Sequence, residues 1–478
     1  MNDDSAQNIG VIGLISVSVM VVIFIVMMVI GLVLTLVMSG SVTTSAETTP
    51  TLVAQLTIEP PVTTTPVAKP IKEETGVKLL LTQAVQARAG RILVVSADQQ
   101  LLTINPDGSG LRTLTQRSDR VGYSFPAWSP DNSQIAVIGD SPEGIYVLED
   151  SAETTPQPIF TSDVRPIYLN WSPNSQQVSF ISPSEGDLSV LNLNVVPSDG
   201  SADSRLMAFG APFYWDWNSD GSELLFNTGG TSHADFAFLN MANGEIGEEI
   251  EAGAFFASPD ISADDAYIAY SSGPRRSQRL VIADRGGVEQ NSIQHVGLIA
   301  FAWSPVRNQL AYTTPRRATL SAYGGLWLVE ATGEPRLMVD EDVITYYWSP
   351  DGSKIAYFTL ADRGQSEQEV NQARTVLASD SPIRPIQDEN NAQLNLSILE
   401  VATGETRVIG RFLPSELFIR QFIPFFDQYA HSHSLWSPDS RAMVMPVQEN
   451  GVTIIYRFPA DGSLPTKVIA GEIAFWSR

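Results

Sequence analysis

Short runs of apolar and β-branched residues recur from about residue 90 to the end of the chain, and turn-forming residues separate each run from the next. Examples are residues 134–137 (Gln-Ile-Ala-Val), residues 354–357 (Lys-Ile-Ala-Tyr) and residues 325–329 (Gly-Leu-Trp-Leu-Val). Brief β-rich runs bounded by Gly, Pro, Asn and Asp predict strands and not helices. Because the runs come in successive groups of four, they predict a repeated four-stranded unit.

A tryptophan closes the first strand of nearly every unit, and in most units a Ser-Pro turn follows it. Copies of Trp-Ser-Pro begin at Trp128, Trp171, Trp303, Trp348 and Trp436, degenerate copies at Trp217 and Ile261, and a truncated copy at Trp476. Up to the fourth full copy the spacing is 42–46 residues. Four strands in such a period are typical of a β-propeller blade. We expect the indoles to be structural wedges between adjacent blades; a ring of exposed, ligand-stacking tryptophans is the alternative.

The repeats resemble the TolB-like family of β-propellers, a WD-repeat-like pattern in which Trp-Ser-Pro-Asp-Gly is followed by Ile-Ala-Tyr or Ile-Ala-Phe. Residues 348–352 and 355–357 carry this pattern in full, and the resemblance covers roughly residues 90–478. It implies an all-β propeller fold. It implies no single function, because such propellers serve as protein-binding platforms, as gating domains of peptidases and as modules of unknown role.

The ends of the repeat array complete each other. If the strands of a unit are named A to D, with the tryptophan at the end of A, seven units contain all four strands. Residues 91–114 supply strands B, C and D without an A strand, and residues 473–476 supply an A strand with nothing after it. We expect these fragments to pair, because pairing removes two exposed sheet edges. The prediction is therefore eight blades; seven is the alternative if the weak unit at Ile261 merges with a neighbour.

Charge and composition exclude several classes of function. The net charge of −24, from 53 acidic and 29 basic residues, disfavours nucleic acid as a partner. The chain has no cysteine, which excludes disulfides, thiolate catalysis and cysteine metal sites. Gly-x-Ser-x-Gly, phosphate-binding and His-Glu-x-x-His motifs are missing, and no hydrolase domain follows the propeller. We therefore expect no catalytic residues and no cofactor.

The N-terminal part of the chain has a different character. After a tail at residues 1–8, residues 9–38 carry no charge and are rich in Val, Ile, Met and Leu. Because about 20 apolar residues span a bilayer, this segment predicts one transmembrane helix. The Thr- and Pro-rich residues 39–76 predict an extended linker to a propeller domain at residues 77–478. We expect a single-pass bacterial membrane protein whose propeller lies outside the cytoplasm, in the periplasm or on the cell surface.

The unit between Trp348 and Trp436 spans 88 residues, about twice the length of the others. The excess is a polar B–C insertion at residues 361–392 and an aromatic D–A insertion at residues 410–430, for which we expect a short helix from Ser415 to Phe422 between two prolines. We expect the linker to attach on the face of the A–B turns, and both insertions belong to the opposite face. Long insertions on one face often mark a binding face; the alternative is that the aromatic residues cap the core.

Two histidines follow the aromatic insertion. His431 and His433 would point to one face of a strand, where Asp427 could join them around a metal ion. We expect instead a polar strand end at the mouth of the channel, and no metal.

The sequence thus predicts a membrane-tethered, non-catalytic binding module, with an enzyme or ligand sensor using the channel mouth as the alternative. The expected partner is another envelope protein, or a peptide or glycan. Aromatic residues and arginine are the usual anchors of an interface. The candidate binding residues are Arg420, Phe425, Phe426, Asp427, His431 and His433.

Overall fold

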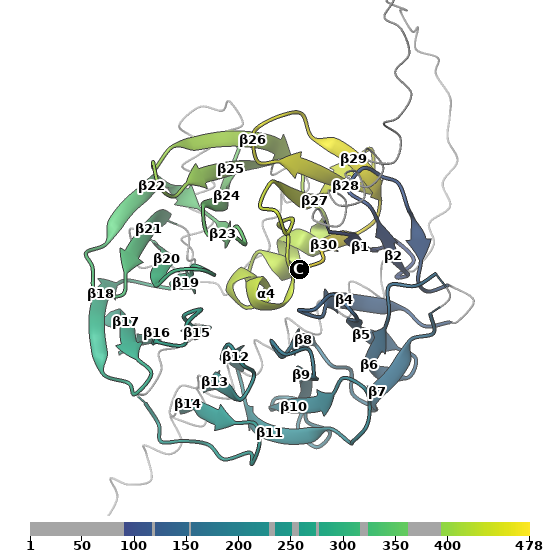
Figure 1. Cartoon of the computed structure of the whole chain (residues 1–478), viewed down its shortest axis with the longest axis horizontal. Coiled ribbons are helices and arrows are strands. Elements are labelled where there is room, and N and C mark those ends of the chain that lie inside the picture. Colours follow the sequence, from purple (N-terminus) through teal and green to yellow (C-terminus); the bar gives the residue numbers. More distant parts are fainter. Residues whose placement is uncertain are drawn as a thin grey trace, which may run out of the picture. The chain divides into compact units, whose positions relative to one another are not determined.

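The computed structural model describes residues 90–116, 120–152, 154–228, 235–250, 258–273, 277–315, 324–361 and 393–478. The predicted tail, transmembrane helix and linker, and the polar insertion after Ala361, lie outside these ranges. Within them, no helix combines the length and apolar character needed to cross a membrane. The described strands form eight antiparallel sheets arranged as a ring (Figure 1), which confirms the all-β propeller and its eight blades.

In seven of the eight blades the strands follow one another along the chain, and strand A is innermost (Figure 1). The first blade contains β4 (Tyr123–Trp128), β5 (Ile135–Asp140), β6 (Glu143–Leu148) and β7 (Gln157–Thr161), and the second contains β8 (Tyr168–Trp171), β9 (Gln177–Pro183), β10 (Leu191–Pro197) and β11 (Arg205–Gly210). The third contains β12 (Tyr214–Trp217), β13 (Glu223–Thr228) and β14 (Asp235–Asn240). The fourth contains β15 (Asp260–Ile261), β16 (Tyr267–Ser272), β17 (Gln278–Asp284) and β18 (Glu289–His295).

The weak unit at Ile261 forms a sheet of its own, so it does not merge with a neighbour. The fifth blade contains β19 (Ala300–Trp303), β20 (Gln309–Thr314), β21 (Gly324–Glu330) and β22 (Arg336–Val343). The sixth contains β23 (Thr345–Trp348), β24 (Lys354–Leu360), β25 (Leu394–Glu400) and β26 (Thr406–Phe412). The seventh contains β27 (Ala442–Glu449), β28 (Val452–Pro459) and β29 (Thr466–Ala470). In the last of these, a single bridge between Trp436 and Met443 stands in the place of strand A.

The eighth blade joins the two ends of the propeller. It is built from β30 (Ile473–Trp476), β1 (Ile92–Val95), β2 (Leu101–Ile104) and β3 (Arg112–Thr113), and β30 pairs with β1 in antiparallel register from Ile92–Trp476 to Val95–Ile473. All eight residues of this pair are buried. The predicted closure is therefore confirmed, and it leaves no open edge where the ring begins and ends.

The repeated tryptophans lie between neighbouring blades. The indole Nε1 of Trp171 donates to the carbonyl of Ala127, 2.9 Å away in the preceding blade. Trp348 donates in the same way to Ala302 at 3.0 Å, and Trp436 to Tyr347 at 3.1 Å. Each acceptor is the residue just before the tryptophan of the preceding blade, so the same bond recurs at three of the blade junctions. The indole of Trp217 instead donates to Ser179 Oγ at 3.1 Å, and the buried Nε1 atoms of Trp128, Trp303 and Trp476 have no partner in the described structure. The indoles join buried strands and do not form an exposed stacking surface.

The aromatic insertion begins in the outer strand β26, which extends to Phe412, and leads to the helix at the centre of the ring (Figure 1). After Phe412 the chain forms a π-helical turn, η3 (Phe418–Phe422), and then the helix α4 (Phe426–Ser432). The predicted helix from Ser415 to Phe422 is thus partly right. The strand expected around His431 is wrong, because the chain continues as a helix beyond Pro424. This helix packs against the inner strands β8, β12, β19 and β23.

Candidate functional site at the centre of the ring

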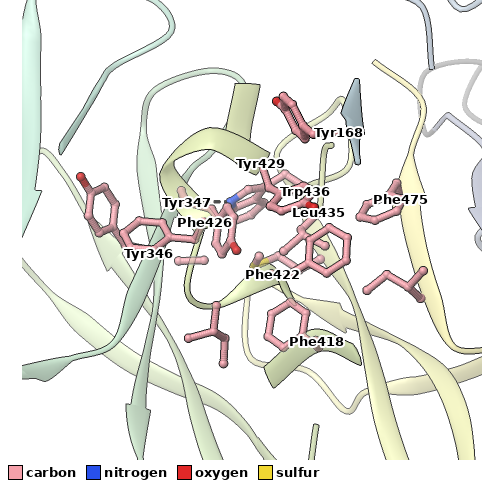
Figure 2. Close-up of a cluster of buried hydrophobic side chains, with 14 of the residues drawn as sticks. Tyr168, Tyr346, Tyr347, Phe418, Phe422, Phe426, Tyr429, Leu435, Trp436 and Phe475 are labelled. Carbon is pink, nitrogen blue, oxygen red and sulfur yellow. Dashed lines mark hydrogen bonds between the residues drawn. The ribbon is translucent and has the colours of Figure 1, made fainter. Parts of the chain in front are cut away.

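One side of α4 is aromatic and fills the middle of the propeller. Figure 2 shows Phe426 beside Tyr346 and Tyr347, with ring centroids 5.2 and 6.1 Å apart. The ring of Tyr429 lies 5.2 Å from that of Tyr168 and 4.4 Å from that of Phe422. These side chains are buried and belong to the largest core cluster of the described residues. The aromatic insertion therefore supplies core packing, which was the alternative to a binding loop.

A buried polar network fixes α4 to two inner strands. The Gln428 side chain donates to the carbonyl of Trp215 at 3.1 Å and accepts from its N–H at 3.3 Å. The Tyr168 hydroxyl donates to Ser432 Oγ at 2.8 Å. Burial raises the pKa of Tyr168 well above its usual range, so the phenol stays protonated. Because these buried polar groups are paired, the network favours one position of the helix.

Two aspartates and a histidine meet where α4 ends. One ligand atom each of Asp216, Asp260 and His431 lies within 4.8 Å of the others, and His431 Nδ1 is 3.3 Å from Asp216 Oδ1. Asp216 comes from β12, Asp260 from β15 and His431 from α4. The two aspartates are 8% and 5% exposed. We call these three residues the Asp-Asp-His cluster.

Each carboxylate of the cluster also binds the backbone of the following blade. Asp216 Oδ2 accepts from the N–H of Ile261 at 3.0 Å, and Asp260 Oδ2 accepts from the N–H of Trp303 at 2.6 Å. Burial and the neighbouring Asp216 carboxylate raise the pKa of Asp260 well above its usual range. A negative charge on both Asp216 and Asp260 is therefore energetically unfavourable.

The cluster lies at the A–B turn end of the ring centre. Asp216 and Asp260 each stand directly before the last residue of an inner strand A. Nearby, the C-terminal Arg478 bonds through its backbone N–H to Asn132, in the A–B turn of the first blade, at 2.6 Å. Its guanidinium donates to the carbonyl of His431. His431 therefore lies at the A–B turn end and not on the opposite face with the two insertions, because α4 extends through the ring centre.

The two histidines do not converge on a common ligand. His433 is 2% exposed and packs against Phe475, with ring centroids 4.6 Å apart. Its Nδ1 is 2.6 Å from Ser432 Oγ, and burial lowers the pKa of His433 to about 3, so the ring is neutral. His431 faces Asp216 instead. The grouping of His431 with His433 that a strand would have allowed does not form, because His431 lies in the last turn of α4 and His433 is the extended residue just after it.

The other candidate binding residues are divided between core and surface. Phe426 is 4% exposed and belongs to the core. Phe425 is half-buried and packs against that core, while Arg420 is exposed and pairs with Glu416 at 2.8 Å. Asp427 lies in the first turn of α4, where burial raises its pKa.

Asp216 and Asp260 were not among the residues predicted from the sequence, although the sequence carries a signal for them. The residue before the tryptophan position is Ala127, Asn170, Ala302, Tyr347, Leu435 or Phe475 in the other units, but aspartate in two consecutive ones. Aspartate at a position that is uncharged in the other units indicates that the inner strands of these two blades carry polar, ionisable groups that the other blades lack there.

No family model and no curated protein matches this chain. Similar solved structures include TolB and other propeller proteins. A TolB from Acinetobacter baumannii is 11% identical, with 80% of this chain and 81% of that chain covered and a TM-score of 0.36. An oligogalacturonate lyase from Vibrio parahaemolyticus is 11% identical, with 70% and 84% covered and a TM-score of 0.44. A eukaryotic initiation factor is 12% identical, with 81% and 98% covered and a TM-score of 0.49. At these identities the likeness concerns the fold alone.

Proposed function

We propose that this chain is a non-catalytic binding module, tethered to a membrane by residues 9–38, with its propeller outside the cytoplasm. The observation that carries the proposal is the filling of the ring centre by the chain's own helix, α4. A ligand is then recognised at the outer faces of the propeller. Support for the tether comes from the uncharged residues 9–38 and the Thr- and Pro-rich residues 39–76 that follow.

The proposed partner is another envelope protein, or a peptide or glycan. It would bind the face that carries the polar insertion at residues 361–392 and the exposed part of the aromatic insertion. On that exposed part, Arg420 and the half-buried Phe425 keep the chemistry of interface anchors, whereas Phe426 does not. We define Arg420, Glu416 and Phe425 as the insertion surface.

A capture experiment with matched charge reversals tests this proposal. The full chain, purified in detergent, is used to capture proteins from an envelope extract, and captured proteins are quantified by mass spectrometry. Arg420 and Arg407 are both exposed and both pair with a glutamate at 2.8 Å, but Arg407 lies on the outer strand β26. We expect Arg420→Glu to lower capture of the principal partner at least about tenfold, the loss of one good anchor, while Arg407→Glu leaves it unchanged. Equal capture by both variants would contradict the assigned surface.

The orientation has its own test. Protease added to intact cells is expected to cleave within residues 43–66 and to release the propeller. Protection of the whole chain until the cells are lysed would contradict an extracytoplasmic propeller.

One observation favours the alternative, an enzyme or ligand sensor that uses the channel mouth. The Asp-Asp-His cluster brings carboxylates and an imidazole together at one end of the ring centre. These residue types serve acid–base and metal chemistry. The alternative requires that a small molecule reach this cluster, and it predicts that variants of the cluster change ligand binding while Arg420→Glu does not.

A further inference from the structure

The Asp-Asp-His cluster joins three elements that are far apart in the sequence. Two come from neighbouring blades and the third from α4, and they meet with a ligand atom each inside 4.8 Å. The His431–Asp216 separation of 3.3 Å is already close to the distance of about 3.4 Å between two ligands of a tetrahedral metal ion with bonds of about 2.1 Å. The ligand atom of Asp260 lies within 4.8 Å of the other two, and it would have to move closer to complete the set.

The cluster has an excess of negative charge in a buried place. Asp216 and Asp260 face each other with little exposure, and Asp427 adds a third carboxyl group near His431. Backbone N–H groups of Trp217, Ile261 and Trp303 donate to the pair, but they carry no net charge. The guanidinium of Arg478 bonds to the His431 carbonyl and not to either carboxylate of the pair. Two buried carboxylates this close require a proton or a cation between them.

We propose that Asp216, Asp260 and His431 bind a divalent transition-metal ion, such as Mn²⁺ or Zn²⁺, at the A–B turn end of the ring centre. Carboxylate oxygens suit Mn²⁺, and imidazole with carboxylates is a ligand set that also binds Zn²⁺. This inference departs from the expectation that the chain binds no metal. It is independent of the proposed partner capture.

The position of the three ligands gives the ion a structural effect. His431 belongs to the last turn of α4, while the aspartates belong to the inner strands of two blades. A bound ion would therefore fasten the helix to the ring at its C-terminal end, where Gln428 and Ser432 already form hydrogen bonds to inner strands. Three protein ligands also leave a coordination position for water or a ligand.

Electron paramagnetic resonance with Mn²⁺ tests the site directly. The full chain in detergent is stripped with a chelator and titrated with Mn²⁺, and the loss of the free-ion signal gives the bound amount. We expect about one Mn²⁺ per chain at saturation, displaced by Zn²⁺, and an echo-modulation signal from the imidazole nitrogen of His431. Asp216→Asn and His431→Gln are expected to weaken binding at least about tenfold, the effect of losing even an outer-shell partner.

Asp220→Asn is the matched control, because Asp220 is an exposed aspartate four positions from Asp216 and outside the cluster. It removes the same charge and is expected to bind Mn²⁺ like the wild type. The proposal is overturned if the wild type binds no Mn²⁺, as expected when a proton is shared between the aspartates. It is also overturned if bound Mn²⁺ shows no nitrogen coupling, a result that does not depend on the folding of any variant.

Discussion

Replacing Phe426 by alanine tests whether the aromatic insertion is core or surface. The side chain is 4% exposed and contacts Tyr346 and Tyr347 edge-on from the first turn of α4. Truncation of a buried phenylalanine costs about 3–5 kcal/mol in free energy of unfolding, from lost burial and the cavity left behind. Tyr346 and Tyr347 are both held in strand β23 and cannot easily collapse into that cavity, so we expect a loss of about 4 kcal/mol.

The expected change in melting temperature follows from the size of the propeller. An unfolding entropy of about 2.1 cal/mol/K per residue gives about 0.8 kcal/mol/K for the propeller, so a loss of 4 kcal/mol lowers the Tm by about 5 °C. The assay is thermal unfolding of the full chain followed by tryptophan fluorescence. Phe209→Ala is the matched control, because Phe209 is 69% exposed on the outer strand β11 and its loss should cost within about 0.5 kcal/mol. Equal Tm values for the two variants would refute the burial of α4.

Three further predictions concern the ring. Deleting residues 473–478 removes β30 and opens the β1 edge, so we expect aggregation or a large loss of stability; an unchanged Tm would argue against closure. Trp171→Phe removes the hydrogen bond to the Ala127 carbonyl, whereas the buried Trp128 N–H has no partner in the described structure. Trp171→Phe should therefore lower the free energy of unfolding by about 1–3 kcal/mol more than Trp128→Phe does. Equal losses of stability in the two variants would contradict a stabilising role of the Trp171 bond. Burial lowers the pKa of His295 to about 4, below the unfolded value of about 6.5. The neutral ring therefore contributes stability that is complete above pH 6.5 and is lost as the pH falls toward 4. Because His295→Gln removes the titrating group, the variant should lose up to about 3 kcal/mol less free energy of unfolding than the wild type over this pH range, as measured by denaturation at each pH. An equal pH dependence of stability in the variant and the wild type would contradict this prediction.

The blades could be predicted from the sequence because their signals are local. Ser-Pro-Asp-Gly after Trp348 specifies the A–B turn through proline at one position and glycine at another, where Gly352 has a φ of +64°. The closing strand was also predictable, since residues 91–114 and 473–476 are complementary parts of one unit.

The place of the aromatic insertion could not be predicted from its composition. A segment with Phe418, Phe422 and Phe426 is suited to a binding surface and to a core alike. Only the folded structure, in which these side chains join the central core cluster, decides between the two. The Asp-Asp-His cluster was hidden for a similar reason. Asp216 and His431 are separated by more than two hundred positions, and only ring closure with an inserted helix brings them together.

Hydrogen exchange across α4 tests most directly the claim that the chain's own helix fills the ring centre. The N–H groups of Tyr429 and His433 donate to the carbonyls of Phe425 and Tyr429 at 3.0 and 2.8 Å, in a helix that is buried on one side. We predict that peptides covering residues 426–433 exchange as slowly as peptides covering β30, because both open only when the ring opens. Exchange as fast as in the exposed turn at residues 461–464 would contradict this claim.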